Sequence, residues 1–180
     1  MNPFLLVTDS NADMVPGFAA ANHVTEMELT YTIDDKTYRC NDPALSRSEF
    51  YGMMRSGKMP ITAQINLEEA NAKLIPILDA GNDVLAIMFS SALSGTYNSV
   101  RLAAEELSPK YPNQKIIVID SLCASAGLGL LIDRAVRYKE SGLGLEDCAA
   151  KIREDILHIA HLFTVDDLFH LHRGGRVSAT

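Results

Sequence analysis

Three short apolar runs, each followed by polar residues and then by a helical pattern, constrain the fold of this chain most strongly. They are FLLV at 4–7, VLAIMF at 84–89 and IIVI at 116–119. Each run is continuous and rich in branched residues, which is typical of a strand covered on both faces. Strands that alternate with helices predict an α/β fold with a mainly parallel sheet and helices on both faces.

The expected helices follow from apolar spacing at helical period and cover 67–80, 95–107, 127–141 and 144–159. In the second of them, Val100, Ala103, Ala104 and Leu107 fall on one face. Pro76 lies inside the first, where we expect a kink or an early end. A fourth core strand is predicted at LFTV, 162–165.

One segment has a different period. MELTYTIDDKTYRC, 27–40, alternates apolar and polar residues around Asp34 and Asp35, which predicts a hairpin or a pair of edge strands. The stretch from 55 to 69 is expected to be a loop that leads into the next helix, with Asn66 as its cap.

The composition of the chain argues against several classes of function. The chain has 180 residues, 47% of them hydrophobic, which is enough for one substantial core. A net charge of −7 without a basic stripe argues against a nucleic-acid partner. No apolar run is long enough for a transmembrane segment, and the start lacks the pattern of a signal peptide, so we expect a cytoplasmic protein. Cys40, Cys123 and Cys148 are expected to be reduced, packed thiols, and no metal site is predicted.

The three apolar runs end in similar polar sequences: TDSNAD, SSALSG and DSLCAS. In open α/β sheets, ligands bind beyond the carboxyl ends of the strands, so these exits predict a small-molecule site. Ser94 precedes a helix that is expected to begin near Gly95. Ser94 is either a simple N-cap or part of an anion-binding site at the helix N-terminus, and the residues alone leave both interpretations open.

Other polar residues are weaker candidates for a functional site. Thr62 reads as a surface loop threonine. Asp9 and Ser10 could bind a ligand or metal, but Asn11 stands where a phosphatase-like motif needs a second acid, so a structural role for Asp9 is favoured. Ser121 is a further ligand or structural candidate. The glycine-containing HLHRGGR segment carries Arg173 and Arg176, and is either a solvated turn or a loop that faces an anion or a partner.

Five segments in order resemble the motifs of the DegV family of bacterial fatty-acid-binding proteins: VTDSNADM, ITAQIN, SSALSGTYNS, VIDSLCASAGLG and LFHLHRGGRVS. The resemblance implies a two-lobed α/β protein that buries one long-chain fatty acid and needs no cofactor. It places the fatty-acid carboxylate on Thr62 and Ser94, with Gly95 as a backbone donor and Thr96 in the same motif. It implies no catalysis by this chain, which would present the acid to a fatty acid kinase subunit for acyl-phosphate formation, within phospholipid metabolism.

The resemblance also suggests a division into domains. Some residues of the chain differ from the usual family motifs. Residues 1–165 are expected to form the first lobe, and 166–180 to begin the connection to a second lobe that the sequence lacks. Ala63 and Ile65 replace a serine and a proline of the usual T-S-Q-P loop. Arg173 and Arg176 are the expected kinase contacts. Two alternatives remain: an enzyme that acts on a small phosphorylated substrate through Asp9, and a purely structural or partner-binding fragment.

Overall fold

A computed structural model describes residues 3–40, 42–165 and 168–178, and its centre is a parallel four-stranded sheet. The strand order is β2 (Thr25–Met27), β1 (Phe4–Asp9), β6 (Asp83–Met88) and β7 (Ile116–Asp120). The three predicted runs are thus the three long neighbouring strands, and every residue of β6 is buried. All carboxyl ends lie at one edge of the sheet, because the pairing is parallel throughout.

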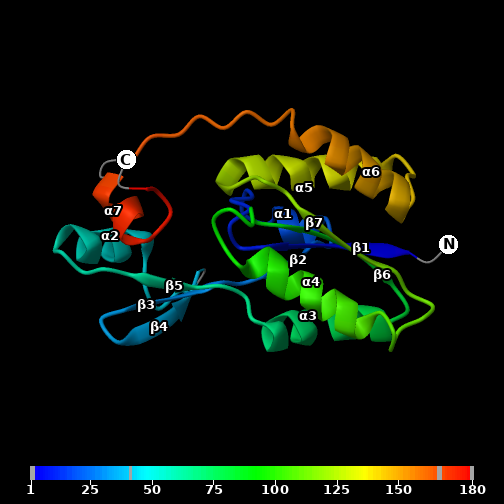
Figure 1. Cartoon of the computed structure of the whole chain (residues 1–180), viewed down its shortest axis with the longest axis horizontal. Helices are drawn as coiled ribbons and strands as arrows, with labels where there is room; N and C mark the ends of the chain where they lie inside the picture. The colour runs from blue at the N-terminus through cyan, green and yellow to red at the C-terminus, as the bar shows by residue number, and fades with distance from the viewer. Residues whose placement is uncertain (1–2, 41, 166–167, 179–180) are drawn as a thin grey trace.

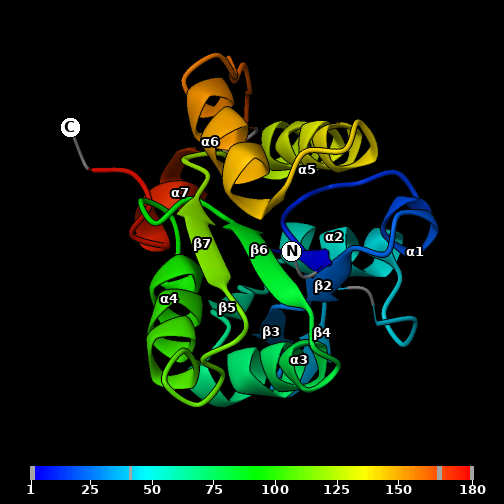
Figure 2. The ribbon, with the colours of Figure 1, turned by 90° about the vertical axis from the view of Figure 1, so that its right-hand side faces the viewer.

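Helices cover both faces of this sheet, as predicted (Figure 1). One face carries α3 (Leu67–Asp79) and α4 (Thr96–Leu107), and the other carries α5 (Ser125–Glu140) and α6 (Leu145–Ile156). Figure 2, turned by 90° from Figure 1, shows α5 and α6 on one side of the sheet and α3 and α4 on the other. The short helix α1 (Phe18–Ala21) lies beside β2. No helix in the described part of the chain is long and apolar enough to cross a membrane.

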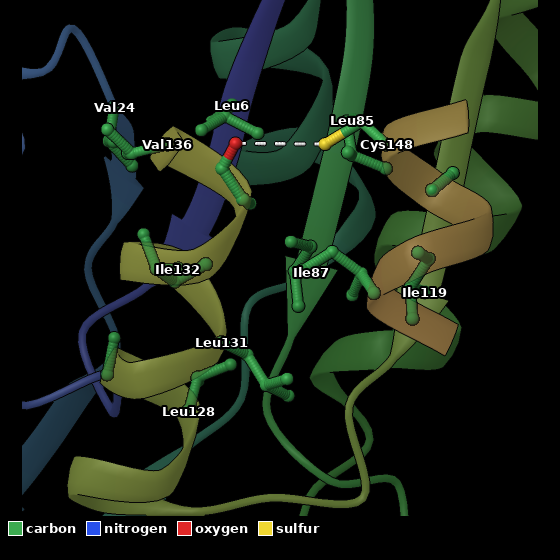
Figure 3. Close-up of a cluster of buried hydrophobic side chains, with 14 of the residues drawn as sticks. Leu6, Val24, Leu85, Ile87, Ile119, Leu128, Leu131, Ile132, Val136 and Cys148 are labelled. Carbon is green, nitrogen blue, oxygen red and sulfur yellow. Dashed lines mark hydrogen bonds between the residues drawn. The ribbon is translucent and has the colours of Figure 1, made fainter. Parts of the chain in front are cut away.

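The core has two halves, one on each face of the sheet. Figure 3 shows the half under α5 and α6, where Leu131 and Ile132 of α5 face Leu6 and Ile87 of the sheet. On the other face, the predicted apolar side of α4 is buried throughout, at Val100, Ala103, Ala104 and Leu107.

The cysteines are free, but only two of them pack as predicted. Cys123 and Cys148 are buried, and the Cys148 thiol donates to the Ala135 carbonyl oxygen at 3.7 Å. Burial raises the pKa of the Cys148 thiol to about 11. Cys40 is exposed, so its assignment as a packed thiol was wrong. It follows β4 (Lys36–Arg39), an edge strand of a small sheet, rather than a core element.

A separate antiparallel sheet contains the predicted hairpin. Its order is β4 (Lys36–Arg39), β3 (Thr30–Ile33) and β5 (Ile61–Ala63). The turn residues Asp34 and Asp35 have φ values of 53° and 60°, as a tight hairpin turn of the primed type requires. The third strand corrects the prediction of a loop at 55–69, because backbone pairing to β3 gives these three exposed residues an extended conformation.

An aromatic contact attaches helix α2 (Arg47–Arg55) to this sheet. The rings of Tyr31 and Phe50 meet edge to face, with centroids 5.0 Å apart, and Tyr38 stacks on Tyr31. The helix begins with a capping box between Ser46 and Glu49.

One prediction about an element was wrong, and of the two outcomes expected at Pro76, a kink or an early end, the early end does not occur. Residues 162–165, all of them described, form no strand and are exposed. The chain after α6 runs across to helix α7 (Leu168–Arg173) instead of joining an edge of the sheet (Figure 1). Pro76 does not end α3, which continues to Asp79 and donates from the Ala80 N–H to the Pro76 carbonyl. The predicted cap Asn66 is confirmed.

Candidate functional site

The loop from β6 into α4 carries the strongest candidate residues. Thr96 is the first residue of α4, and Gly95 rather than Ser94 is its cap, so the helix starts one residue later than predicted. The Ser94 Oγ accepts from the Thr96 N–H at 3.2 Å, and the two hydroxyl oxygens are 3.0 Å apart. This short turn replaces the expected cap. It holds Ser94 and Gly95 half-buried at the helix N-terminus, above the buried Thr96.

The backbone N–H groups of this loop are occupied up to Ser94. Each of the six from Phe89 to Ser94 donates to an acceptor of the protein. The next one, on Gly95, has no acceptor among the described residues. It adjoins the first turn of α4, where free N–H groups and the helix dipole create a partial positive charge. The arrangement therefore presents an unused backbone donor.

The segment between β5 and α3 crosses this helix terminus. The Ile65 N–H donates to the Thr96 Oγ1 at 3.2 Å, and the Gln64 amide donates to the Ser99 Oγ at 3.3 Å. A Cβ at position 95 would lie 2.0 Å from the Gln64 Oε1, so a larger residue there would require the exposed Gln64 side chain to move. Gln64 was not predicted to take part in the site, although it lies within the ITAQIN stretch.

Thr62 belongs to the strand that leads into this segment. Thr62 lies in β5, two residues before Gln64, and is exposed as predicted, but in a strand rather than a loop. Its Oγ1 accepts from the Arg176 Nη2 at 3.1 Å. Arg176 also donates to the Gly174 carbonyl oxygen at 2.5 Å, which fixes the guanidinium near its own turn. The charged Arg176 side chain therefore contacts Thr62, one of the predicted site residues.

Arg173 lies elsewhere. It lines a shallow hollow with Met54, Gly57, Lys58 and Met59, between the end of α2 and α7. The two arginines of the HLHRGGR segment thus face different surroundings.

Asp9 and Ser10, at the end of β1, make internal hydrogen bonds. The fully buried Asp9 carboxylate accepts from the Phe89 N–H at 2.8 Å and from the backbone and side-chain N–H groups of Asn11 at 3.0 and 2.9 Å. Burial raises the pKa of Asp9, and these hydrogen bonds oppose the shift. The Ser10 Oγ accepts from the Leu29 N–H at 3.0 Å, which ties the β1 exit to the start of the small sheet.

Ser121, after β7, is also internal. It is fully buried, and its Oγ accepts from the Cys123 N–H at 3.0 Å. Asp120, which the sequence analysis left without a role, accepts at one carboxylate oxygen from the N–H groups of Ser91 and Leu122, at 3.0 and 3.2 Å. The polar strand exits are thus used largely to hold loops together.

The polar groups that are not used to hold the loops together are of the kinds that bind anions. They comprise the open Gly95 N–H, the hydroxyl groups of Ser94 and Thr62, and the Arg176 guanidinium. Backbone donors at a helix N-terminus with hydroxyl and guanidinium groups nearby are the usual partners of carboxylates and phosphates. Among the residues that the structure describes, no three histidine, cysteine or acidic side chains gather as a metal site would need.

Comparisons with known proteins agree on one family. The family model described as DegV matches residues 3–180. A DegV domain-containing protein of Clostridium perfringens is 38% identical over 181 residues, which cover 100% of this chain and 62% of that protein. One from Lactococcus lactis is 34% identical over 97% of this chain and 61% of its own length. The chain thus spans a little over three fifths of these relatives.

Solved structures show the same fold. A DegV family protein from Thermus thermophilus, described by its fatty acid binding, superposes with a TM-score of 0.85 at 29% identity, over 97% of this chain and 60% of that one. DegV from Bacillus subtilis, described as a fatty acid binding protein, gives a TM-score of 0.83 at 26% identity over 99% of this chain and 62% of its own.

Proposed function

The chain belongs to the DegV family, and we propose that it binds a long-chain fatty acid with the carboxylate at the N-terminus of α4. In this proposal the carboxylate accepts from the hydroxyl groups of Thr62 and Ser94 and from the Gly95 N–H. The fatty acid binding of the Thermus thermophilus and Bacillus subtilis relatives supports the ligand class.

The observation that carries the proposal is the unused donor on Gly95 beside Ser94. The Ser94 Oγ can accept from both the N–H and the hydroxyl group of Thr96, because the Thr96 oxygen itself accepts from the Ile65 N–H. In that arrangement the Ser94 proton is left for an external acceptor. In the proposed complex, the Gly95 N–H and the Ser94 hydroxyl group bind the carboxylate, and Thr62 with its bound Arg176 supplies a third polar contact.

Exposed apolar residues are sequence neighbours of two of these polar residues. Ile61 precedes Thr62 and is 71% exposed, and Leu93 precedes Ser94 and is 36% exposed. Because successive side chains of a strand point to opposite faces, Ile61 and Thr62 of β5 do not share a face. Removing an acyl chain from water is favourable by ~0.8 kcal/mol per CH₂, so a fatty acid needs apolar surface around its chain.

We further propose a binding role without catalysis. The chain would present its fatty acid to a kinase subunit in the cytoplasm, with Arg173 and Arg176 as candidate contacts for an acidic partner surface. The division into a first lobe at 1–165 and a connection from 166 stays a prediction.

An enzymatic role for Asp9 is the weaker alternative. Both of its oxygens accept hydrogen bonds and the side chain is fully buried, so the carboxylate is not placed to attack a phosphorus atom or to bind an open metal ion. A lack of turnover with phosphomonoesters in the presence of magnesium would agree with this geometry.

The test is extraction of the natively purified protein with organic solvent, followed by mass spectrometry. We expect a long-chain fatty acid in the extract of the wild type. In Ser94→Ala and Thr62→Ala we expect the amount of bound fatty acid to fall at least tenfold, which corresponds to the loss of roughly one to two hydrogen bonds. The controls are Thr32→Ala, on the neighbouring strand of the same sheet, and Ser141→Ala, at the end of α5. Equal fatty acid content in all five proteins would refute the assigned contacts, and an empty wild type would refute the function.

A further inference from the structure

Two carboxylates hold the candidate loop from opposite sides. Asp9 ends β1 and Asp120 ends β7, and these two strands flank β6 in the sheet. We infer that Asp9 and Asp120 are positioning residues, which orient the loop from Phe89 to Gly95 so that its last N–H faces the ligand. This inference rests on the proposed carboxylate site and adds to it two residues that do not touch the ligand.

The Asp9 side of this clamp fixes the start of the loop. Its Oδ2 accepts from the Phe89 N–H at 2.8 Å, directly after the last residue of β6. Its Oδ1 is held by the backbone and side-chain N–H groups of Asn11. The carboxylate therefore cannot rotate without losing several hydrogen bonds inside the protein, where each unsatisfied group is costly.

The Asp120 side fixes the loop two residues later. One oxygen of Asp120 accepts from the Ser91 N–H at 3.0 Å and from the Leu122 N–H at 3.2 Å. Between the two contacts, the Ser90 N–H donates to the Cys123 carbonyl oxygen at 3.0 Å. Of these three successive N–H groups, the first is thus bound by the end of β1, and the next two are bound by the end of β7 and the segment after it.

These contacts determine which N–H group of the loop is left without an acceptor. With Phe89, Ser90 and Ser91 fixed, the turn closes on itself through the Leu93 and Ser94 N–H groups, both of which donate to the Ser90 carbonyl oxygen. Gly95 is then the first position whose N–H has no acceptor in the described chain. Fixing donors before the ligand arrives avoids the entropic cost of ordering them on binding.

The test compares Asp9→Asn and Asp120→Asn with Asp83→Asn in the 180-residue chain. Asp83 is a matched control, because its buried carboxylate also accepts from the backbone of a neighbouring segment, the Lys115 N–H at 2.9 Å, but at the opposite end of β6. The probe is the fluorescent fatty acid cis-parinaric acid, titrated well below each melting temperature. Amide hydrogen exchange of residues 89–95 is recorded on the same samples.

We expect Asp9→Asn and Asp120→Asn each to bind the probe about tenfold more weakly and to exchange the loop amides faster, because Asp9→Asn removes one of two acceptor oxygens and Asp120→Asn replaces a charged acceptor by a weaker neutral one. Asp83→Asn should lower the melting temperature comparably and leave affinity within about twofold, because it is remote from the loop. Affinity losses that merely follow the melting temperature across all three variants would overturn the positioning role while leaving the fatty-acid site intact. A wild type that does not bind the probe would overturn the proposed function itself.

Discussion

Single polar candidate residues have one of two roles, and their hydrogen-bond partners separate them. Asp9, Ser10 and Ser121 bind backbone N–H groups inside the protein, whereas Ser94 and Thr62 keep part of their hydrogen-bonding capacity at the surface. The sequence identified all five as candidates, Thr62 through the resemblance to the family and the other four through residue type and position after a strand. Only the hydrogen bonds of the folded chain distinguish the two roles.

Asp9 should make stability depend on pH in a specific direction. Burial raises its pKa above the ordinary value of 3.8, so the folded protein holds this proton at a pH where the unfolded chain has lost it. The stability that protonated Asp9 contributes is complete below 3.8 and is lost as the pH rises through the folded pKa. We expect the free energy of unfolding of the wild type, minus that of the non-titrating Asp9→Asn, to fall over this range and then level off.

Urea unfolding of both proteins between pH 3 and pH 8 measures this difference. A difference that instead increases with pH would mean that the hydrogen bonds from Phe89 and Asn11 outweigh the cost of burial.

At the scale of elements, the sequence predicted those whose apolar pattern is local. The strands β1, β6 and β7 and the helices α3 to α6 were predicted, as was the β3–β4 hairpin, because burial on two faces, on one helical face or around a tight turn leaves a period in the chain. The strand β5 was missed because its three residues are all exposed and carry no such period. Its conformation comes from pairing with β3.

Two helical glycines allow a matched test of how α5 packs. A Cβ on Gly129 of α5 would lie 2.2 Å from the backbone oxygen of Ala12, which cannot move aside cheaply, whereas one on Gly52 of α2 would meet nothing within 4 Å. Gly129→Ala should therefore lower the free energy of unfolding by about 1–3 kcal/mol through overpacking. Gly52→Ala should raise it by about 0.5–1 kcal/mol through helix propensity.

Denaturant unfolding of the two variants beside the wild type checks both signs. Stabilisation by Gly129→Ala would show that α5 does not contact the loop after β1 as closely as the structure places it.

At the scale of the whole molecule, the apolar run at 162–165 shows the limit of sequence reasoning. Its composition is that of a core strand, but no layer of the described chain covers it. Leu162 is 98% exposed, Phe163 82% and, in α7, Phe169 72%. A linear reading finds the apolar run but not what lies against it, which depends on the rest of the tertiary structure. The contact of Arg176 with Thr62, 114 residues apart, was unpredictable for the same reason.

Exposed aromatic and aliphatic side chains of this size are a liability in water, and the 180-residue chain should therefore self-associate. Clustered apolar surface associates at micromolar to millimolar concentrations, so sedimentation velocity over that range should show species larger than a monomer. The double variant Phe163→Ser, Phe169→Ser should move the distribution toward monomer. Leu102→Ser, which removes a single leucine that is 47% exposed on α4, should not. A wild-type chain that stays monomeric throughout would mean that the residues after α6 fold back onto the body in solution and cover these side chains themselves.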